Sequence, residues 1–149
     1  MRKTSPVEEL RAGRSVVIYT VGDSMQPLLA ERTTHVHLRP LDERGLKLLD
    51  IVLYVRDNGQ TVLHRLVHMD DTHYYMRGDS TYGLESIRHD QAVGVAVRIY
   101  RKGEQIDVET DRRYQAYVSR RMRSYPIRYL AVRVKWKLQR MLKRPRTRK

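Results

Sequence analysis

The sequence contains no cysteine among its 149 residues. Disulfide bonds, thiolate metal sites and a cysteine nucleophile are therefore excluded. It also lacks any apolar run of the roughly 18–20 residues that a membrane-spanning helix needs. The first fourteen residues are mostly polar or charged, so we expect neither a secretory signal nor an N-terminal membrane anchor.

Acidic residues are missing from the C-terminal part of the chain. Residues 112–149 hold fifteen Lys and Arg and no Asp or Glu, whereas residues 1–111 hold fifteen bases and all seventeen acids. The net charge of +13 is therefore a property of the C-terminal segment. This asymmetry predicts a nearly neutral domain over residues 1–111 and a basic tail over 112–149 that meets an anionic surface.

Short runs of β-branched and aromatic residues, separated by turn signals, fill most of residues 1–111. A capping box at Ser5 and Glu8, with Pro6 in the first helical position, predicts a short helix before them. The segment 57–60 predicts a hairpin turn. The fold class is thus mainly β, with a short N-terminal helix and a C-terminal helical extension. Strands are expected over residues 15–21, 35–38, 50–56, 61–68, 72–77, 92–100 and 105–109.

In the basic tail, the spacing of the apolar residues becomes helical. From Tyr114 to Lys143, apolar residues recur at three- and four-residue steps, which predicts a basic amphipathic helix. Pro126 is expected to divide this helix or to kink it. We expect residues 144–149 to be disordered. The apolar series is Ile127, Leu130, Ala131, Val134, Leu138 and Met141.

One candidate for chemistry follows the first predicted strand directly, in Gly22-Asp23-Ser24-Met25. A turn after a strand exposes a serine side chain and leaves backbone N–H groups free to face an oxyanion. A serine in this position also suits the cap of a short helix that begins at Met25. The segment alone does not decide between a nucleophile and a cap.

Five segments follow one another over about residues 15–100, at 22–27, 49–54, 62–67, 76–80 and 92–96. In this order they resemble the superfamily that joins type I signal peptidases with the self-cleaving domains of SOS-type repressors. The resemblance implies the β-fold of that superfamily and Ser24 as the nucleophile. It implies His64 as the general base, because His64 is followed by Arg65 as in the histidine-type members, while Lys47 lies outside the matching segment.

The resemblance also implies the surroundings of this pair. A histidine base usually has an orienting partner on its second ring nitrogen. Asp79, in the segment that resembles the family's Gly-Asp motif, is the expected partner, and Glu85 is a weaker second candidate. Since Gly22 carries no hydroxyl, backbone N–H groups, above all that of Ser24, are expected to stabilise the oxyanion. The residues expected to form the oxyanion and substrate contacts are Gly22, Asp23 and Met25.

Histidine side chains are also common metal ligands. His35 and His37 flank one residue and so share a strand face, but no further ligand stands at an obvious spacing. We therefore expect no metal site and no cofactor.

The sequence thus predicts a serine endopeptidase that cleaves an extended, leader- or signal-like peptide after a small residue. Two alternatives are a non-catalytic peptide- or membrane-binding module on the same scaffold and a basic protein associated with nucleic acid. For the tail, contact with an anionic membrane is favoured over docking on the body or a partner protein, and nucleic acid is least favoured. The expected location is the cytoplasm or the inner membrane face.

Overall fold

The computed structural model describes residues 4–143. It consists of two compact units, Met1–Gln115 and Ala116–Lys149. The long C-terminal helix begins at Arg112, where the charge pattern predicts the change from body to tail. Its first turn nevertheless belongs to the first unit, because the division falls after Gln115.

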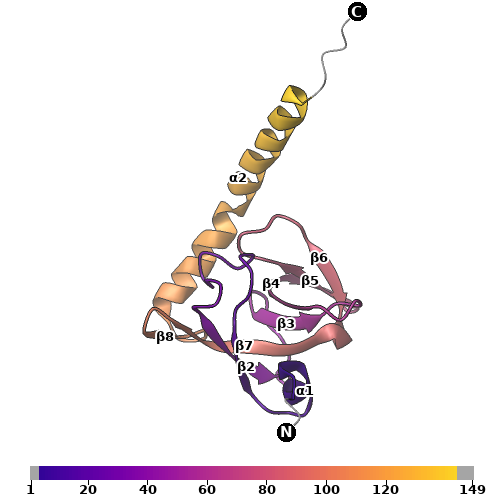
Figure 1. The fold of residues 1–149 in the computed structure, drawn as a ribbon, viewed down its shortest axis with the longest axis vertical. Helices are drawn as coiled ribbons and strands as arrows, with labels where there is room; N and C mark the ends of the chain where they lie inside the picture. The colour runs from indigo at the N-terminus through magenta and orange to yellow at the C-terminus, as the bar shows by residue number, and fades with distance from the viewer. Residues whose placement is uncertain (1–3, 144–149) are drawn as a thin grey trace, which may run out of the picture. The chain divides into compact units, whose positions relative to one another are not determined.

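Eight strands, all paired antiparallel, form one sheet in the first unit (Figure 1). Their order across the sheet is β1-β2-β7-β3-β4-β5-β6, with β8 added to β7. The mainly β fold class is therefore confirmed, and the seven predicted strands are all present with small shifts at their ends. The strands are β1 (Val16–Tyr19), β2 (His35–Pro40), β3 (Ile51–Val55), β4 (Thr61–Met69), β5 (His73–Arg77), β6 (Glu85–Arg88), β7 (Ala92–Arg101) and β8 (Glu104–Asp107).

Strand β6 is the element that the sequence pattern does not predict. It forms the edge of the sheet beside β5, and a single 3₁₀ turn, η1 (His89–Gln91), connects it to β7. Only Ile87 of its four residues is buried. A short edge strand with one apolar side chain gives little periodic signal, so this strand depends on pairing with β5 rather than on its own sequence.

The core lies against the centre of the sheet, where β3 buries four consecutive residues. Among them is Tyr54, whose relative exposure is 0%. A buried tyrosine needs a hydrogen-bonding partner for its hydroxyl, and this requirement leads to the site described below. One cluster of the core comprises Val52, Tyr54, Leu66, Met76, Ile87 and Ala92.

The N-terminal helix α1 (Pro6–Arg11) starts with the predicted capping box. The N–H of Glu8 donates to Oγ of Ser5, and the N–H of Ser5 donates to Oε2 of Glu8. Leu10, buried on this helix, lies against Gly94 of β7, where an added Cβ would come within 2.9 Å of the leucine Cδ1. Glycine at that position therefore allows the helix to pack closely on the sheet.

The C-terminal helix α2 (Arg112–Leu142) is one continuous element. Asp111 caps its start, because Oδ1 accepts from the N–H of Tyr114 at 2.9 Å. The helix is not divided at Pro126, which excludes one of the two outcomes predicted for this proline. A proline removes one helical hydrogen bond, at a cost of about 3 kcal/mol, but the many turns on either side keep theirs, so the loss stays local.

Residues 144–149, for which the sequence predicts disorder, lie outside the described residues. Among residues 4–143, no helix combines the length and the apolar character that crossing a bilayer requires. The long helix α2 fails this requirement because basic side chains occur along its whole length.

Candidate active site

Ser24 lies on the turn that follows β1. Gly22 has φ +84°, a conformation that residues with a Cβ rarely adopt. Ser24 is half-buried, whereas Met25, next to it, is only 4% exposed and anchors the turn in the core. Asp23 is exposed, and its carbonyl accepts from the N–H of Gln26. The turn is thus fixed by its apolar side and presents the serine on its other side.

A second loop, at residues 78–81, holds this turn in place. The N–H of Ser80 donates to the carbonyl of Ser24 at 2.9 Å, and Oγ of Ser80 donates to the carbonyl of Asp23 at 2.7 Å. An added Cβ on Gly78 would lie 2.4 Å from the carbonyl oxygen of Ser24. Glycine is therefore required there, since the two backbones touch and neither can yield cheaply.

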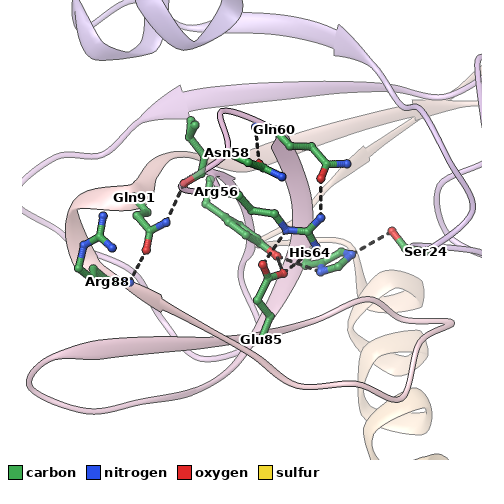
Figure 2. Close-up of polar contacts among 10 residues, drawn as sticks. Ser24, Arg56, Asn58, Gln60, His64, Glu85, Arg88 and Gln91 are labelled. Atoms are coloured by element: carbon green, nitrogen blue, oxygen red, sulfur yellow. Dashed lines mark hydrogen bonds and ion pairs between the residues drawn. The ribbon is translucent and has the colours of Figure 1, made fainter.

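His64 meets Ser24 from the middle of β4. Its side chain is 9% exposed, and Nε2 lies 3.0 Å from Oγ of Ser24. Figure 2 shows the histidine ring directed at the serine hydroxyl. This separation is within the hydrogen-bonding reach that a serine nucleophile and its base require.

The other ring nitrogen of His64 has a partner that sequence reasoning missed. Nδ1 lies 3.2 Å from the hydroxyl of Tyr54, and that hydroxyl donates to Oε2 of Glu85 at 2.5 Å. In the β3–β4 register Val52 is opposite His64, so Tyr54, two residues along β3, shares its face. The buried phenol thus lies between His64 and Glu85.

The single proton of the Tyr54 hydroxyl determines the state of the histidine. Because this proton is donated to Glu85, the oxygen accepts from Nδ1–H of His64. A neutral imidazole carries one proton, so Nε2 is then bare and directed at the serine hydroxyl. This is the tautomer in which His64 can take a proton from Ser24.

Arg56 holds the acid in position. Its Nε and a terminal nitrogen donate to the two oxygens of Glu85 at 2.6 and 2.9 Å, and its other terminal nitrogen donates to Gln60 at 2.7 Å. Figure 2 shows Glu85 joined to Arg56 by dashed lines, close to the histidine ring. The bidentate pair lowers the pKa of Glu85 below its usual value, chiefly through the hydrogen bonds from Arg56. Glu85 is thus kept ionised.

The pKa of His64 is lowered from its usual value of 6.5, first because burial disfavours the charged ring and also because Arg56 is near. Glu85 and Asp79 act in the opposite direction, since their negative charges favour the imidazolium. The net result is a ring that is neutral at pH 7 and has an acid within reach to stabilise the positive charge when it forms.

The structure places Asp79, which the resemblance implies as the partner of His64, against Arg65. Both of its oxygens accept from Arg65 at 2.7 Å, and neither side chain has any exposed surface. Arg65 also donates to the carbonyl of Leu49 and to the hydroxyl of Tyr114. Successive side chains of a strand point to opposite faces, which separates the surroundings of Arg65 from those of His64. A buried guanidinium needs a carboxylate, and Asp79 supplies it.

A cleft of about 460 Å³ opens beside the serine and the histidine. One wall is the end of β1 with the nucleophile turn, and the other is the first half of β4 with Leu53 and Arg56. The three residues expected to contact substrate, Gly22, Asp23 and Met25, all line this cleft. Among the described residues, the N–H of Ser24 donates to no protein group, so it remains available to an acceptor in the cleft.

The remaining candidates lie apart from this site. Lys47 is exposed and faces Glu109 at 3.5 Å. His35 packs its ring on Tyr19, with centroids 4.0 Å apart. In the part of the chain that the structure describes, no group of three or more His, Asp or Glu side chains gathers as metal ligands would.

Comparison with protein-family models, with curated proteins and with solved structures finds no match to this chain in any of the three. The functional interpretation therefore depends on the geometry of the site and on the sequence motifs.

Proposed function

We propose that this protein is a serine endopeptidase of the signal-peptidase type, with Ser24 as nucleophile and His64 as general base. The observation that carries the proposal is the 3.0 Å separation of Nε2 of His64 from Oγ of Ser24 at the edge of a cleft. A polar pair of this kind in a cleft, with the base held by further hydrogen bonds, is the arrangement that nucleophilic catalysis needs.

In the first half of the reaction, Oγ of Ser24 attacks the carbonyl carbon of the scissile bond while Nε2 of His64 takes its proton. The carbonyl electrons move to oxygen, and the N–H of Ser24 donates to this oxyanion. The C–N bond then breaks, and His64 gives its proton to the departing amine. An acyl ester on Ser24 remains.

In the second half, a water molecule attacks the ester, with His64 again taking the proton. The C–O bond to Ser24 breaks and the hydroxyl regains its proton from His64. During each charged stage, Nδ1–H of the imidazolium donates to Tyr54, whose own proton is directed at Glu85. The negative charge of Glu85 thus stabilises the imidazolium through the phenol.

The proposed substrate is an extended peptide lying in the cleft. Support comes from two strand edges: β1 is the last strand on its side of the sheet, and β5 pairs with β4 only from Arg65 onward. In the described structure the outer edge of residues 61–64 is therefore open. Backbone hydrogen bonds to such edges bind a peptide in extended form, and the aliphatic lining, which includes Leu29, Leu53 and Leu63, suits a small apolar residue before the cut.

Removal of a leader or signal-like peptide is the activity that fits this substrate class. We propose that it takes place in the cytoplasm or at the inner face of the membrane.

The test uses a fluorophosphonate probe, which reacts with an activated serine without needing a known substrate. Wild-type protein is expected to form a covalent adduct at Ser24, located by mass spectrometry of the digest. Ser24→Ala should give no adduct and should keep the melting temperature within a few degrees, since Ser24 is not in the core. His64→Gln should label at least about 100-fold more slowly, because general base catalysis contributes roughly 10²–10⁴-fold.

Cleavage is then measured with a peptide library and both variants. A folded wild-type protein that never labels and cuts no peptide would contradict the proposal and favour a non-catalytic binding module. A Ser24→Ala protein that cuts as well as wild type would show that another residue is the nucleophile.

A further inference from the structure

The second half of helix α2 carries a stripe of exposed aliphatic side chains. They recur at three- and four-residue steps and so share one side of the helix. Each is at least half exposed, from 50% at Val134 to 74% at Ile127. The members of this aliphatic stripe are Ile127, Leu130, Val134, Leu138 and Met141.

A second, aromatic series lies on the opposite side of the same helix. Residues two positions apart in an α-helix differ by about 200° around the axis. Trp136, two positions from both Val134 and Leu138, therefore points away from the side that carries them. The rings of Tyr125 and Tyr129, on the side of Trp136, stack with centroids 5.8 Å apart. Guanidinium groups of Arg128 and Arg133 lie within 6 Å of these rings, at 5.9 and 5.7 Å. Tyr125 and Tyr129 therefore have partners within the helix, whereas Trp136 is 47% exposed.

Basic residues lie on both flanks of the aliphatic stripe. Arg128 and Lys135 fall on one flank, and Lys137 with Arg140 falls on the other, by the rotation of about 100° per residue. Residues 112–149 contain no acidic residue that could neutralise this charge internally. An apolar stripe between two basic flanks is complementary to a surface that is apolar beneath an anionic layer.

We infer that the aliphatic stripe of α2 inserts into the headgroup region of an anionic lipid bilayer, with the basic flanks against the lipid phosphates. The stripe and the flanks each match one layer of that surface. A nucleic acid would use the basic groups but would leave five aliphatic side chains in water. The inference does not depend on chemistry at Ser24, and its experiment gives a result whether or not the protein is a peptidase.

The test measures co-sedimentation of the full chain with vesicles of phosphatidylcholine and with vesicles that also contain phosphatidylglycerol. We expect at least about tenfold stronger binding to the anionic vesicles, and a decrease as salt is added. Leu138→Asp should weaken this binding about tenfold. Gln139→Asp is the matched control, because it adds the same charge to the neighbouring exposed residue on another side of the helix, and it should weaken binding much less.

The side of the helix that inserts is read from tryptophan fluorescence, since Trp136 is the only tryptophan in the chain. Its emission should stay nearly unchanged when anionic vesicles bind. In a Trp136→Phe, Val134→Trp double variant, the tryptophan emission should shift to the blue when anionic vesicles bind.

Three results would overturn the inference. They are equal binding of the Leu138→Asp and Gln139→Asp variants, a blue shift of Trp136 without one at position 134, and binding to duplex DNA that is tighter than to anionic vesicles at the same salt.

Discussion

Two arginine–carboxylate pairs near the candidate active site have the same chemistry and different surroundings. Arg65 and Asp79 have side chains with 0% exposure, and their hydrogen bonds join β4 to the loop that holds the nucleophile turn. Arg56 and Glu85 are about one-third exposed, at 34% and 29%, and Glu85 also accepts from Tyr54 beside His64. The deeper pair therefore joins backbone segments, while the shallower one lies beside His64 and influences its pKa.

The buried pair should dominate stability. Asp79→Ala leaves the Arg65 guanidinium inside the protein without its acid, and we expect a loss of about 3–5 kcal/mol in the free energy of unfolding, measured by urea denaturation. Glu85→Ala, at the partly exposed pair, also removes the acceptor of the Tyr54 hydroxyl and should lose less, about 1–2 kcal/mol. An Arg65→Met, Asp79→Leu double variant should recover much of the lost stability. Equal losses for Asp79→Ala and Glu85→Ala would contradict the distinction between the two pairs.

The exposed pair acts through Tyr54, so removing the phenol hydroxyl should break the chain of contacts. For Tyr54→Phe we expect the rate of fluorophosphonate labelling at Ser24 to fall about 10–100-fold, within the contribution of a general base. The ¹⁵N NMR signals of the His64 ring should also lose their preference for the tautomer with Nδ1 protonated. A lower rate with the tautomer unchanged would mean that Tyr54 only packs against the base.

The difference between the two pairs also shows what the sequence could predict. Ser24 and His64 stand in segments whose order resembles a known superfamily, and the structure brings them to 3.0 Å. Asp79 also stands in such a segment. A sequence motif shows that a carboxylate occurs at this position, but it does not show which side chain that carboxylate contacts. The neighbour Arg65, fully buried, is the residue that needs that carboxylate.

The positions of Tyr54 and Arg56 on the same sheet face as His64 could have been inferred from strand register. The segment 57–60 predicts the turn between β3 and β4, and such a turn sets which residues are opposite. Tyr54 and His64 then fall on one face, two positions apart along the strands. Glu85 could not have been placed in this way, because β6 is a short edge strand whose existence the sequence does not signal.

A smaller effect on the labelling rate is expected from a substitution of Glu85 itself. Glu85→Gln keeps the size of the side chain and an oxygen for Tyr54, but removes the charge that favours the imidazolium. We expect labelling of Ser24 to slow about tenfold, less than for Tyr54→Phe, with the free energy of unfolding changed by no more than about 1 kcal/mol. Asn at position 79 is the matched comparison: Asp79→Asn should cost more stability than Glu85→Gln. The reverse order would contradict the roles assigned to the two acids.

The smallest expected effect is a shift in pH dependence, and its sign distinguishes the members of the exposed pair. Labelling requires neutral His64, so its rate should rise with pH through the pKa of the ring, which burial lowers below 6.5. Glu85 raises the pKa of His64 and Arg56 lowers it. Glu85→Gln should therefore move the acidic limb of the rate profile to lower pH, and Arg56→Gln should move it to higher pH, each by about one unit or less.

The two shifts are measured from labelling rates between pH 4 and 8 on folded variants. Asp79 acts on the same pKa as the weakest of the four influences, so Asp79→Asn should displace the limb least. Shifts of the same sign for Glu85→Gln and Arg56→Gln would mean that burial changed in both variants and that the charges of this pair do not act on His64. Shifts of opposite sign would show that Arg56 and Glu85 act on the pKa of His64. A pair that only stabilised the fold would not move the acidic limb of the rate profile.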